Sequence, residues 1–429
     1  MTIIRPFRGL LYNRKAVGNL AKVITPPYDV ITPRQQVRYY KSHPKNFIRI
    51  DLGKTSKKDS ASNNRYTRAR GFFERWIKEG VFTKDDASSI YVYSQEYKEA
   101  GRRKARLGFI SLAKLEEDRT KGFLPHERTF SGPKMDRFRL MKEVKANLSP
   151  IFSIVFDDNK KIMQILKDVA YRWKPILDVE FEGTRNKIWR MSDEGLITKL
   201  SRAIRNKRAL IADGHHRYEV ALEYRRYMLK TKKEAIPGAY DYVMMYFATS
   251  DPAGLTILPT HRMVAGISTV RLRKNLDKLN KYFDIIETGS RYAMFSCMKA
   301  GRKRHAIGVY LGGRDYMCLR LKRKDAGAFI DSKNSSCWRN LDVVILHHLV
   351  FEKALGIKGH GAEKAITFTR DAEEAFDWTA SGIGRVSFFL NPPDLKDINN
   401  IVKRQERMPH KTTYFYPKPP SGLVINKLE

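Results

Sequence analysis

The stretch from Arg208 to Lys230, RALIADGHHRYEVALEYRRYMLK, limits the possible folds more than any other part of the sequence. Its apolar run at residues 209–212 is typical of a buried strand, and Asp213-Gly214 is a turn pair through which a strand does not continue. Apolar residues from Tyr218 to Met228 then recur at steps of three and four, which predicts an amphipathic helix. The sequence therefore predicts a strand, a glycine turn and a helix in direct succession.

This succession is the layout of an anion site. The first N–H groups of a helix have no intrahelical partner, and the helix dipole favours negative charge beside them. Gly214 lets a ligand approach the backbone, while His215, His216 and Arg217 add side-chain donors. Each charge-assisted hydrogen bond contributes about 1.5–3 kcal/mol. Several such bonds together predict a site for a polyphosphate.

Two other interpretations of the same residues stay open. The two histidines beside Asp213 are possible metal ligands, although adjacent residues diverge at a helix start and no third ligand follows at a fixed spacing. Alternatively, Asp213 is only the cap of the helix and the histidines are solvated.

A second cluster of ionisable residues lies between Pro125 and a predicted amphipathic helix. Phosphoryl transfer to an alcohol needs a carboxylate that deprotonates the hydroxyl, cations on the transferred group and usually Mg²⁺. We interpret Glu127 as this base and Asp136 as a magnesium ligand, whereas Arg128, Lys134 and Arg137 are candidates to neutralise phosphate. A surface ion-pair network in which Asp136 pairs with Arg137 and Lys134 is the alternative. The cluster comprises His126, Glu127, Arg128, Thr129, Lys134, Asp136 and Arg137.

The motif DGHHR at residues 213–217 resembles that of a widespread family of long-uncharacterised conserved proteins, and also that of archaeal free serine kinases. Those kinases share a nucleotide-binding core with sulfiredoxins and the ParB proteins. The resemblance to the uncharacterised family covers nearly the whole chain. Its further motifs are PPYDV at 26–30, PHERT at 125–129, NLSPIF at 147–152, LPTHR at 258–262, MPHK at 408–411 and TYFYPK at 413–418.

The resemblance implies an α+β fold with a mixed sheet, in which a ParB/sulfiredoxin-like core with helices is elaborated by insertions and a smaller appended subdomain. It implies transfer of the γ-phosphate of ATP, or of phosphate from ADP, to the hydroxyl of free L-serine, with Mg²⁺ bridging the phosphates. Asp213 and His216 would then join Glu127 in catalysis, and Gly214, His215, His216 and Arg217 would hold the nucleotide. The expected substrate-binding residues are Asp29, His126, Thr129, His261, Arg262 and Lys411.

Some of these residues have plainer alternatives. Asp29 is equally well placed to cap the following helix or to bind magnesium or a substrate amine. His261 is as readily a buried structural histidine. The aromatic run from Lys411 to Leu423 predicts a segment that packs back on the main domain, where Lys418 and Ser421 would face the cleft, although core packing alone also explains its aromatic residues.

The charge of the chain attracts polyanions. With 82 Lys and Arg against 46 Asp and Glu, the net charge is +36 and the pI is near 10.0. The basic residues are spread along the chain and no nucleic-acid module is recognisable, so we favour a solvated surface over a dedicated nucleic-acid face. A ParB-like nucleotide switch that binds nucleic acid is the alternative function. A phosphotransferase or nucleotide hydrolase with another small acceptor is a third.

Composition also bears on the location. No apolar run reaches the roughly 18–20 residues of a membrane helix, and the first residues, MTIIRPFRGLLYNRK, lack a signal-peptide pattern. We therefore expect a cytoplasmic protein that does not enter a membrane. Cys297, Cys318 and Cys337 form no CxxC pair, so neither a disulfide framework nor a zinc site is indicated. No feature indicates an oligomeric state.

We expect three parts: a main nucleotide-binding and catalytic domain at 1–264, a smaller lysine-rich subdomain at 265–336, and a C-terminal segment at 337–429 that returns to the main domain. Within them, residues 47–52 alternate like a strand. Two antiparallel strands are predicted at 90–93 and 107–112, joined by a charged connection at 96–106. A hairpin is predicted at 306–311 and 316–321, with Gly312-Gly313 at its turn, after a lysine-rich helix at 270–283.

Overall fold

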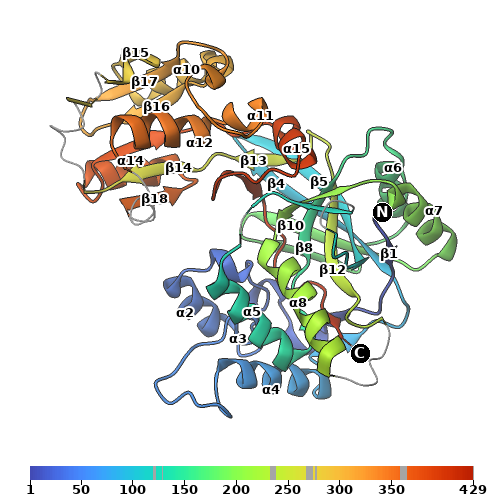
Figure 1. The fold of residues 1–429 in the computed structure, drawn as a ribbon. Coiled ribbons are helices and arrows are strands. Elements are labelled where there is room, and N and C mark those ends of the chain that lie inside the picture. Colours follow the sequence, from blue (N-terminus) through green and yellow to red (C-terminus); the bar gives the residue numbers. More distant parts are fainter. Residues whose placement is uncertain are drawn as a thin grey trace. The chain divides into compact units, whose positions relative to one another are not determined.

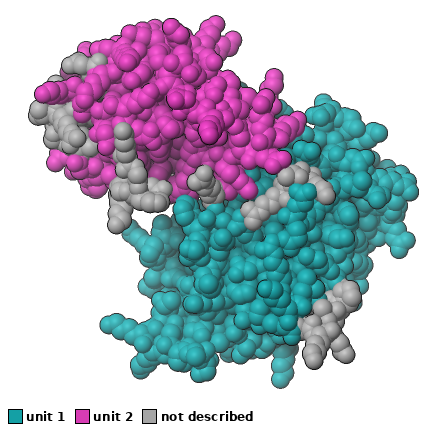
Figure 2. All heavy atoms as spheres, in the orientation of Figure 1, with its two compact units in different colours: residues 1–125, 129–256, 417–429 teal, residues 126–128, 257–416 magenta. Residues whose placement is uncertain are grey.

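The structure, a computed structural model, describes residues 1–118, 122–127, 129–231, 238–266, 274–275, 278–357 and 365–428. The chain forms two compact units, which Figure 2 shows in teal and magenta. Unit 1 comprises residues 1–125, 129–256 and 417–429, and unit 2 comprises residues 126–128 and 257–416. The peptide at 126–128 therefore leaves unit 1 at Pro125 and returns to it at Thr129.

Unit 1 is built on a nine-stranded mixed sheet. The pairs β6–β11 and β8–β12 are parallel, and the other pairs are antiparallel. The mixed α+β architecture predicted from the sequence is thus confirmed. Along the sheet the order is β6 (Phe123–Pro125), β11 (Ala209–Asp213), β8 (Ile151–Val155), β12 (Tyr242–Thr249), β5 (Arg102–Lys114), β4 (Ile90–Glu99), β10 (Thr184–Met191) and β9 (Leu177–Phe181), and β1 (Ile4–Arg5) pairs with β5.

The central strands of this sheet are buried because helices cover them. All five residues of β8 are buried, and seven of the eight residues of β12. Helix α8 (His215–Thr231) packs against α5 (Ser131–Val144), and α5 packs against α4 (Arg65–Lys78), as Figure 1 shows. Helices α6 (Lys161–Arg172) and α7 (Glu194–Arg205) pack on one another. In the part of the chain that the structure describes, no helix is long and apolar enough to cross a membrane.

A tight hairpin joins β4 to β5. The charged connection predicted at 96–106 continues both strands instead, and Glu99 pairs directly with Arg102. The turn consists of Ala100 and Gly101, with φ of 46° and 77°, which is the backbone of a two-residue hairpin turn. Lys104 stabilises it through an ion pair with Glu99 at 3.1 Å. Charged side chains do not exclude a strand here, because one face of the hairpin reaches solvent while Tyr97 and Arg106 are buried on the other.

Residues 48–51 form a helical turn, α3 (Ile48–Asp51), so the strand predicted at 47–52 is wrong. The side chain of Asn46 accepts a hydrogen bond from the Ile48 N–H at 2.9 Å, which starts the turn. Phe47, Ile48 and Ile50 are all fully buried. The apolar residues of this buried turn alternate in the sequence with Arg49 and Asp51, and this alternation resembles the pattern of a strand.

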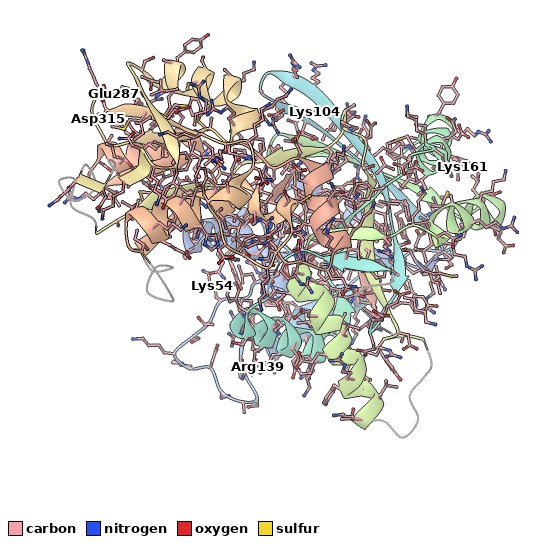
Figure 3. All side chains as sticks on the ribbon, turned by 45° about the horizontal axis from the view of Figure 1, so that its top comes forward. Lys54, Lys104, Arg139, Lys161, Glu287 and Asp315 are labelled. Atoms are coloured by element: carbon pink, nitrogen blue, oxygen red, sulfur yellow. The ribbon has the colours of Figure 1, made fainter. Side chains whose placement is uncertain are left out.

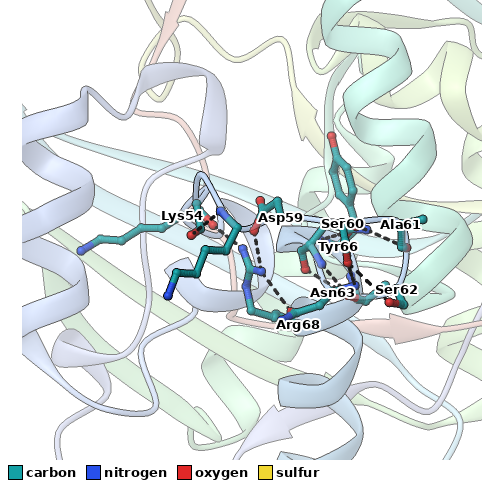
Figure 4. Close-up of polar contacts among 12 residues, drawn as sticks. Lys54, Asp59, Ser60, Ala61, Ser62, Asn63, Tyr66 and Arg68 are labelled. Carbon is teal, nitrogen blue, oxygen red and sulfur yellow. Dashed lines mark hydrogen bonds and ion pairs between the residues drawn. The ribbon is translucent and has the colours of Figure 1, made fainter.

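The lysine- and serine-rich loop before α4 is held by its own polar contacts (Figure 4). Arg68 of α4 reaches back to Asp59 at 2.7 Å and to the side chain of Asn63 at 3.2 Å. The side chain of Asn64 caps the helix by accepting from the N–H groups of Tyr66 and Thr67. A cavity of about 400 Å³ opens beside this loop, and none of the site residues predicted from the sequence lines it.

Unit 2 is organised around a six-stranded sheet, whose strands pair antiparallel. The hairpin predicted at 306–321 is confirmed as β16 and β17, and Gly312 and Gly313 have positive φ. Helices α10 (Arg291–Ala300) and α14 (Ala372–Ala380) supply Met294, Met298 and Phe376 to its core. The order is β15 (Phe283–Thr288), β17 (Tyr316–Leu321), β16 (Ile307–Tyr310), β19 (Val386–Phe389), β14 (His261–Val264) and β18 (Ile366–Thr369).

The division into units differs from the three parts expected. Residues 337–416 lie in unit 2 rather than returning to the main domain, because β18 and β19 complete the sheet that β15 to β17 begin. The last residues, 417–429, do belong to unit 1, where Asn426 pairs with Asn147. Of the lysine-rich helix predicted at 270–283, residues 270–273 and 276–277 lie outside the described residues, and Phe283 already belongs to β15.

Candidate functional site

The turn between β11 and α8 depends on Gly214. Its φ of +90° lies in the left-handed region, which favours glycine. A Cβ at this position would lie 2.8 Å from Nη2 of Arg217, closer than nonbonded atoms approach. The turn therefore needs glycine for two reasons, its backbone conformation and the guanidinium that packs over it. The strand, turn and helix predicted from the sequence are all present.

Asp213 is held by two cations. Arg217, one helical turn later, donates to Oδ2 at 2.6 Å, and Nζ of Lys418 lies 2.6 Å from Oδ1. Lys418 also pairs with Oδ2 of Asp29 at 2.5 Å. The side chains of Lys418 and Asp213 are only 10% and 14% exposed, so this pair is largely shielded from water, whereas that of Asp29 is 38% exposed. Three motifs that are remote in the sequence, those of Asp29, Asp213 and Lys418, thus meet in unit 1.

Arg217 faces the protein rather than open solvent. Besides Asp213, its Nη1 donates to Oγ of Ser149 at 2.8 Å and to the carbonyl of Pro150 at 2.6 Å. Among the described residues its Nε has no hydrogen-bond partner. Arg217 thereby ties the NLSP motif to the glycine turn. These contacts indicate that Arg217 stabilises the glycine turn.

The charges around Asp29 keep its carboxylate ionised. Partial burial opposes ionisation, but Lys418 and Arg217 outweigh it and lower the pKa of Asp29. Asp29 does not cap the following helix α2 (Pro33–Ser42), whose cap is Thr32. Of the alternatives that the sequence left open for Asp29, helix capping is thus excluded.

His216 is neutral and has a defined tautomer. The N–H of Phe130 donates to its Nε2 at 3.1 Å, so Nε2 carries no proton and the proton resides on Nδ1. Burial lowers the pKa of His216, against the raising effect of Glu219. The Phe130 ring stacks on the imidazole with their centroids 6.5 Å apart. His216 is thus positioned as a neutral Nδ1–H donor at the start of α8. Its neighbour His215 is buried.

The segment that follows the PHER motif docks on α8 through Glu219. Thr129 donates to Oε2 of Glu219 at 2.5 Å, and Nζ of Lys134 lies 3.2 Å from the same oxygen. Together with the bond from Phe130 to His216, these contacts hold residues 129–134 along the first turns of α8. Glu219 was not among the predicted site residues. The sequence shows it only as one of several charged residues on the polar side of the helix, and no motif distinguishes it from the others.

Asp136 and Arg137 belong to an internal network. Arg137 is 7% exposed, pairs with Asp51 at 3.0 Å and with Asp136 at 2.5 Å, and lies 4.0 Å from the centroid of the Tyr28 ring. Asp136 also accepts hydrogen bonds from Arg65 and Tyr66. Burial opposes ionisation of Asp136, but Arg137, Tyr66 and Arg65 lower its pKa.

This network does not fit a resident magnesium ion. Both oxygens of Asp136 already accept hydrogen bonds, and the pairing with Arg137 is the one that the sequence left as an alternative. Among the described residues, no group of three His, Cys, Asp or Glu side chains is arranged to hold a metal. A cavity of about 40 Å³ between this network and Arg217 has room for about three to four waters, at roughly 10–15 Å³ for each.

Unit 2 contains the other predicted residues. His126 is fully buried, and its Nε2 shares a hydrogen bond of 2.8 Å with Oγ1 of Thr413. The N–H of Met408 donates to its carbonyl at 2.9 Å. Nε2 of His126 lies 3.9 Å from Oε1 of Glu127, whose side chain is 23% exposed. The MPHK and TYFYPK motifs therefore fix the peptide that carries Glu127.

Lys411 lies in the same part of unit 2 with a strained backbone. Its φ of +54° is unusual for a residue with a side chain. Burial and Arg262 lower its pKa, whereas Glu127 raises it. Nη2 of Arg262 donates to the Lys411 carbonyl at 3.0 Å. Glu127, Arg262 and Lys411 are thus electrostatic neighbours within unit 2.

His261 is a structural residue in this fold. Its Nδ1 accepts from the N–H of Leu390 at 3.3 Å, and its ring packs on Phe389. Burial lowers its pKa to about 4, so the imidazole is neutral. Successive residues of a strand point to opposite faces, which separates His261 from Arg262.

The structure thus distributes the predicted residues over two units. Unit 1 contains Asp29, Thr129, Lys134, Asp136, Arg137, Asp213, Gly214, His215, His216 and Arg217, and unit 2 contains His126, Glu127, His261, Arg262 and Lys411. Arg128 lies outside the described residues. Lys418 was expected to face the cleft but not to pair with Asp29 and Asp213, and nothing in the sequence indicated Ser149 or Asp51 individually.

The family model that matches, over residues 4–344, is described as DUF1015, a protein of unknown function. No curated protein matches the chain.

Several solved structures are similar, at low identity. A free serine kinase in complex with AMP shares 13% identity, with a TM-score of 0.35, over 73% of this chain and 97% of that one. A conserved hypothetical protein from Pyrococcus furiosus shares 14% identity, with a TM-score of 0.33, over 71% and 92%. SbnI with a C-terminal truncation, from Staphylococcus aureus, shares 13% identity, with a TM-score of 0.35, over 73% and 85%.

Proposed function

The chain belongs to the DUF1015 family, and from this premise we propose that it is a small-molecule kinase that transfers the γ-phosphate of ATP, or phosphate from ADP, to the hydroxyl of free L-serine. The observation that carries the proposal is the glycine turn at the start of α8, which Arg217 and Lys418 shape through Asp213. The sequence likeness of DGHHR to the free serine kinases supports the choice of reaction.

The phosphates are assigned to unit 1. Helix α8 has 17 residues, so its first N–H groups, at His215 and His216, carry the full positive end of a helix dipole. The left-handed backbone of Gly214 leaves these groups without a Cβ in front of them. His216 adds a neutral Nδ1–H donor. Asp213, Arg217 and Lys418 act as positioning residues, since their charges are spent on one another.

The hydroxyl acceptor and its base are assigned to unit 2. Glu127 accepts the proton of the serine hydroxyl as the Oγ–P bond forms and the bond from phosphorus to the leaving nucleotide oxygen breaks. Lys411, whose pKa burial and Arg262 lower, supplies a cation near this carboxylate. Magnesium enters as the complex of the nucleotide and counts as part of the substrate, because both carboxylate oxygens of Asp136, the expected ligand, already accept hydrogen bonds.

We also propose that unit 1 contains a ParB/sulfiredoxin-like core. A ParB/sulfiredoxin-like core is supported by the mixed sheet in which β11 leads directly into the glycine turn. A cytoplasmic location also stays a prediction, and imaging of the tagged protein in its own cells tests it.

The net charge of +36 favours a second candidate, a ParB-like protein that binds nucleic acid. Figure 3 shows basic side chains such as Lys54, Lys104, Arg139 and Lys161, which come from a loop, a strand and two helices of unit 1. Such scattered charges favour nonspecific attraction. Tight binding of a defined DNA or RNA that weakens steeply with salt would support the second candidate, and its absence in a gel shift would remove it.

The kinase proposal is tested with purified protein, Mg²⁺ and ATP or ADP, to which each amino acid is added in turn. We expect phosphoserine from L-serine alone, detected by mass spectrometry, and its loss in His216→Ala and Arg217→Ala. Nucleotide turnover that ignores serine would retain the nucleotide site and assign another acceptor. No turnover with any amino acid would contradict the proposal.

A further inference from the structure

A polar cavity of about 80 Å³ lies within unit 2, and no role has been assigned to it so far. It is bounded by β14, by α12 (Asp342–Ile345) and by the start of α15 (Leu395–Lys403). At roughly 10–15 Å³ for each water, it has room for about five to eight waters, or for a molecule the size of a small amino acid. Its charged lining residues are Arg262, Arg302, His305, Asp342, Asp394 and Asp397.

Arg262 provides a buried positive charge in the wall of this cavity. It is 1% exposed, and its Nη groups donate to the carbonyls of Thr260 and Lys411. Among the described residues its Nε has no hydrogen-bond partner. Burial lowers its pKa to about 9, and no described carboxylate forms an ion pair with it. An anionic group in the cavity would supply the missing acceptor and the missing countercharge.

Carboxylates provide the opposite charge. Asp342 is already matched by His305, whose Nδ1 lies 2.8 Å away, and Asp394 is matched at the exposed rim by Arg302 at 2.7 Å. Asp397 is half-buried, and its carboxylate forms no ion pair with a described residue. Burial and the neighbouring Asp394 raise its pKa more than the charges of His305, Lys396 and Arg302 lower it. A cationic group beside Asp397 would therefore be favourable. The cavity thus presents one group of each sign that has no ion-pair partner among the described residues, Arg262 and Asp397; we call these two the unmatched groups.

We propose that this cavity binds a small zwitterion, a free α-amino acid, with its carboxylate on Arg262 and its ammonium on Asp397. Placing the acceptor here rests on the proposed kinase function and makes the cavity its acceptor site. An amino acid satisfies both unmatched groups at once, whereas an anion alone leaves Asp397 uncompensated. The side chain of the ligand is then the part that stays free for chemistry.

The experiment measures binding by calorimetry to the full chain without nucleotide. L-serine is compared with ethanolamine, which lacks the carboxylate, and with 3-hydroxypropanoate, which lacks the ammonium. We expect L-serine to bind, and each analogue to bind about tenfold more weakly or worse, because a buried polar group is left unpaired in each case.

Two variants assign the ends of the ligand. Asp397→Asn is expected to weaken L-serine about tenfold and to leave 3-hydroxypropanoate unchanged, because that analogue has no ammonium. Arg262→Lys is expected to weaken L-serine and 3-hydroxypropanoate but not ethanolamine. Asp377→Asn, the same substitution on the exposed side of α14, is the matched control. If Arg262→Lys does not fold, the effect of Asp397→Asn on L-serine binding still tests the proposed site.

The outcomes separate this inference from the proposed function. Serine-dependent turnover in which Asp397→Asn changes neither binding nor the KM for serine would overturn the cavity as the acceptor site and leave the kinase standing. The expected binding pattern in a protein without turnover would support the cavity and remove the kinase. Absence of L-serine binding at millimolar concentration would overturn the inference whatever the turnover assay gives.

Discussion

Lys418 is the residue on which the geometry of unit 1 depends most. It lies between Asp29 and Asp213, at 2.5 and 2.6 Å, and is 10% exposed. Two carboxylates this close to one another repel unless a cation separates them. The ammonium of Lys418 therefore takes the place between two carboxylates that a metal ion occupies in other proteins. Its four-carbon stem lets the last residues of the chain close the site.

We expect Lys418→Met to lower the free energy of unfolding by about 2 kcal/mol. The value is below the roughly 3–5 kcal/mol for breaking a fully buried pair, because Asp29 is 38% exposed. Urea denaturation measures it, with Lys161→Met on the exposed face of α6 as the matched control (Figure 3). Equal stability of the two variants would show that Lys418 is not needed to hold the carboxylates.

Gly214→Ala tests the turn itself. A residue other than glycine in the left-handed region costs about 1–2 kcal/mol, and the new Cβ would also displace the Arg217 guanidinium. We expect nucleotide affinity to fall about tenfold or more, measured by calorimetry. Gly132→Ala, in α5, has open space around its Cβ and serves as the control. Unchanged affinity in Gly214→Ala would remove the turn from the nucleotide site.

At the scale of residues, features formed by neighbours in the sequence were easier to predict than contacts between residues far apart in it. The turn at Asp213-Gly214 followed from the sequence because its strand, its glycine and its helix are neighbours in the chain. The pairing of Asp213 with Lys418 did not, since more than two hundred residues separate them. For the same reason the sequence could not decide whether Arg217 and Arg137 point outward or support the interior.

At the scale of elements, regular periodicity gave reliable predictions where one face is buried. Helix α8 and strand β11 lie where the sequence predicts them. The exceptions have opposite patterns. Residues 96–106 form strands although they are charged, because the charged side chains lie on the face that reaches solvent while Tyr97 and Arg106 are buried. Residues 48–51 form a helical turn although they alternate, because both sides of the turn are buried.

The start of α4 gives a prediction at this scale. Asn64 accepts from two N–H groups of the first turn, at 2.9 and 3.2 Å. We expect Asn64→Ala to lower the free energy of unfolding by about 1 kcal/mol, measured by thermal and urea denaturation. Asn63→Ala, which removes one contact with Arg68 but no cap, is expected to change it less. A larger effect of Asn63→Ala would contradict the assigned cap.

At the scale of the whole molecule, the domain boundaries could not be read from composition. Strands β18 and β19 reach unit 2 only after an intervening helical stretch, and sheet order is decided by pairing between remote segments. The lysine-rich composition of residues 265–336 marks part of unit 2 without marking its end. The TYFYPK motif predicted the return of the chain to unit 1, but that return begins only at Pro417.

Buried neutral histidines make stability depend on pH. Burial lowers the pKa of His261 to about 4 and of His347 to about 3, whereas both are near 6.5 in the unfolded chain. As the pH falls from 6.5 towards 4, the unfolded chain binds protons that the folded chain does not. Each histidine then lowers the free energy of unfolding by up to about 1.4 kcal/mol per pH unit.

For His305 the dependence of stability on pH has the opposite sign. Asp342 outweighs burial and raises the pKa of His305, so its contribution to the free energy of unfolding is present at low pH and is lost as the pH rises. Urea denaturation at pH 7, 6 and 5 measures the net slope. We expect His347→Phe to reduce the loss of stability on acidification, since this histidine is then absent from both states. If stability fell equally with pH in this variant and in the wild-type protein, His347 would bind its proton over the same pH range in the folded chain as in the unfolded chain, which would contradict its lowered pKa.

The most direct measurement of the central claim is serine-dependent formation of phosphoserine by the wild-type protein and by Glu127→Gln. The exposed Glu287→Gln of unit 2 is the matched control (Figure 3). Loss of a general base typically costs about 10²–10⁴ in rate, so we predict that Glu127→Gln loses turnover by that factor while its nucleotide affinity, and the activity of Glu287→Gln, stay unchanged. Full activity in Glu127→Gln, or no phosphoserine from the wild-type protein, would contradict the account.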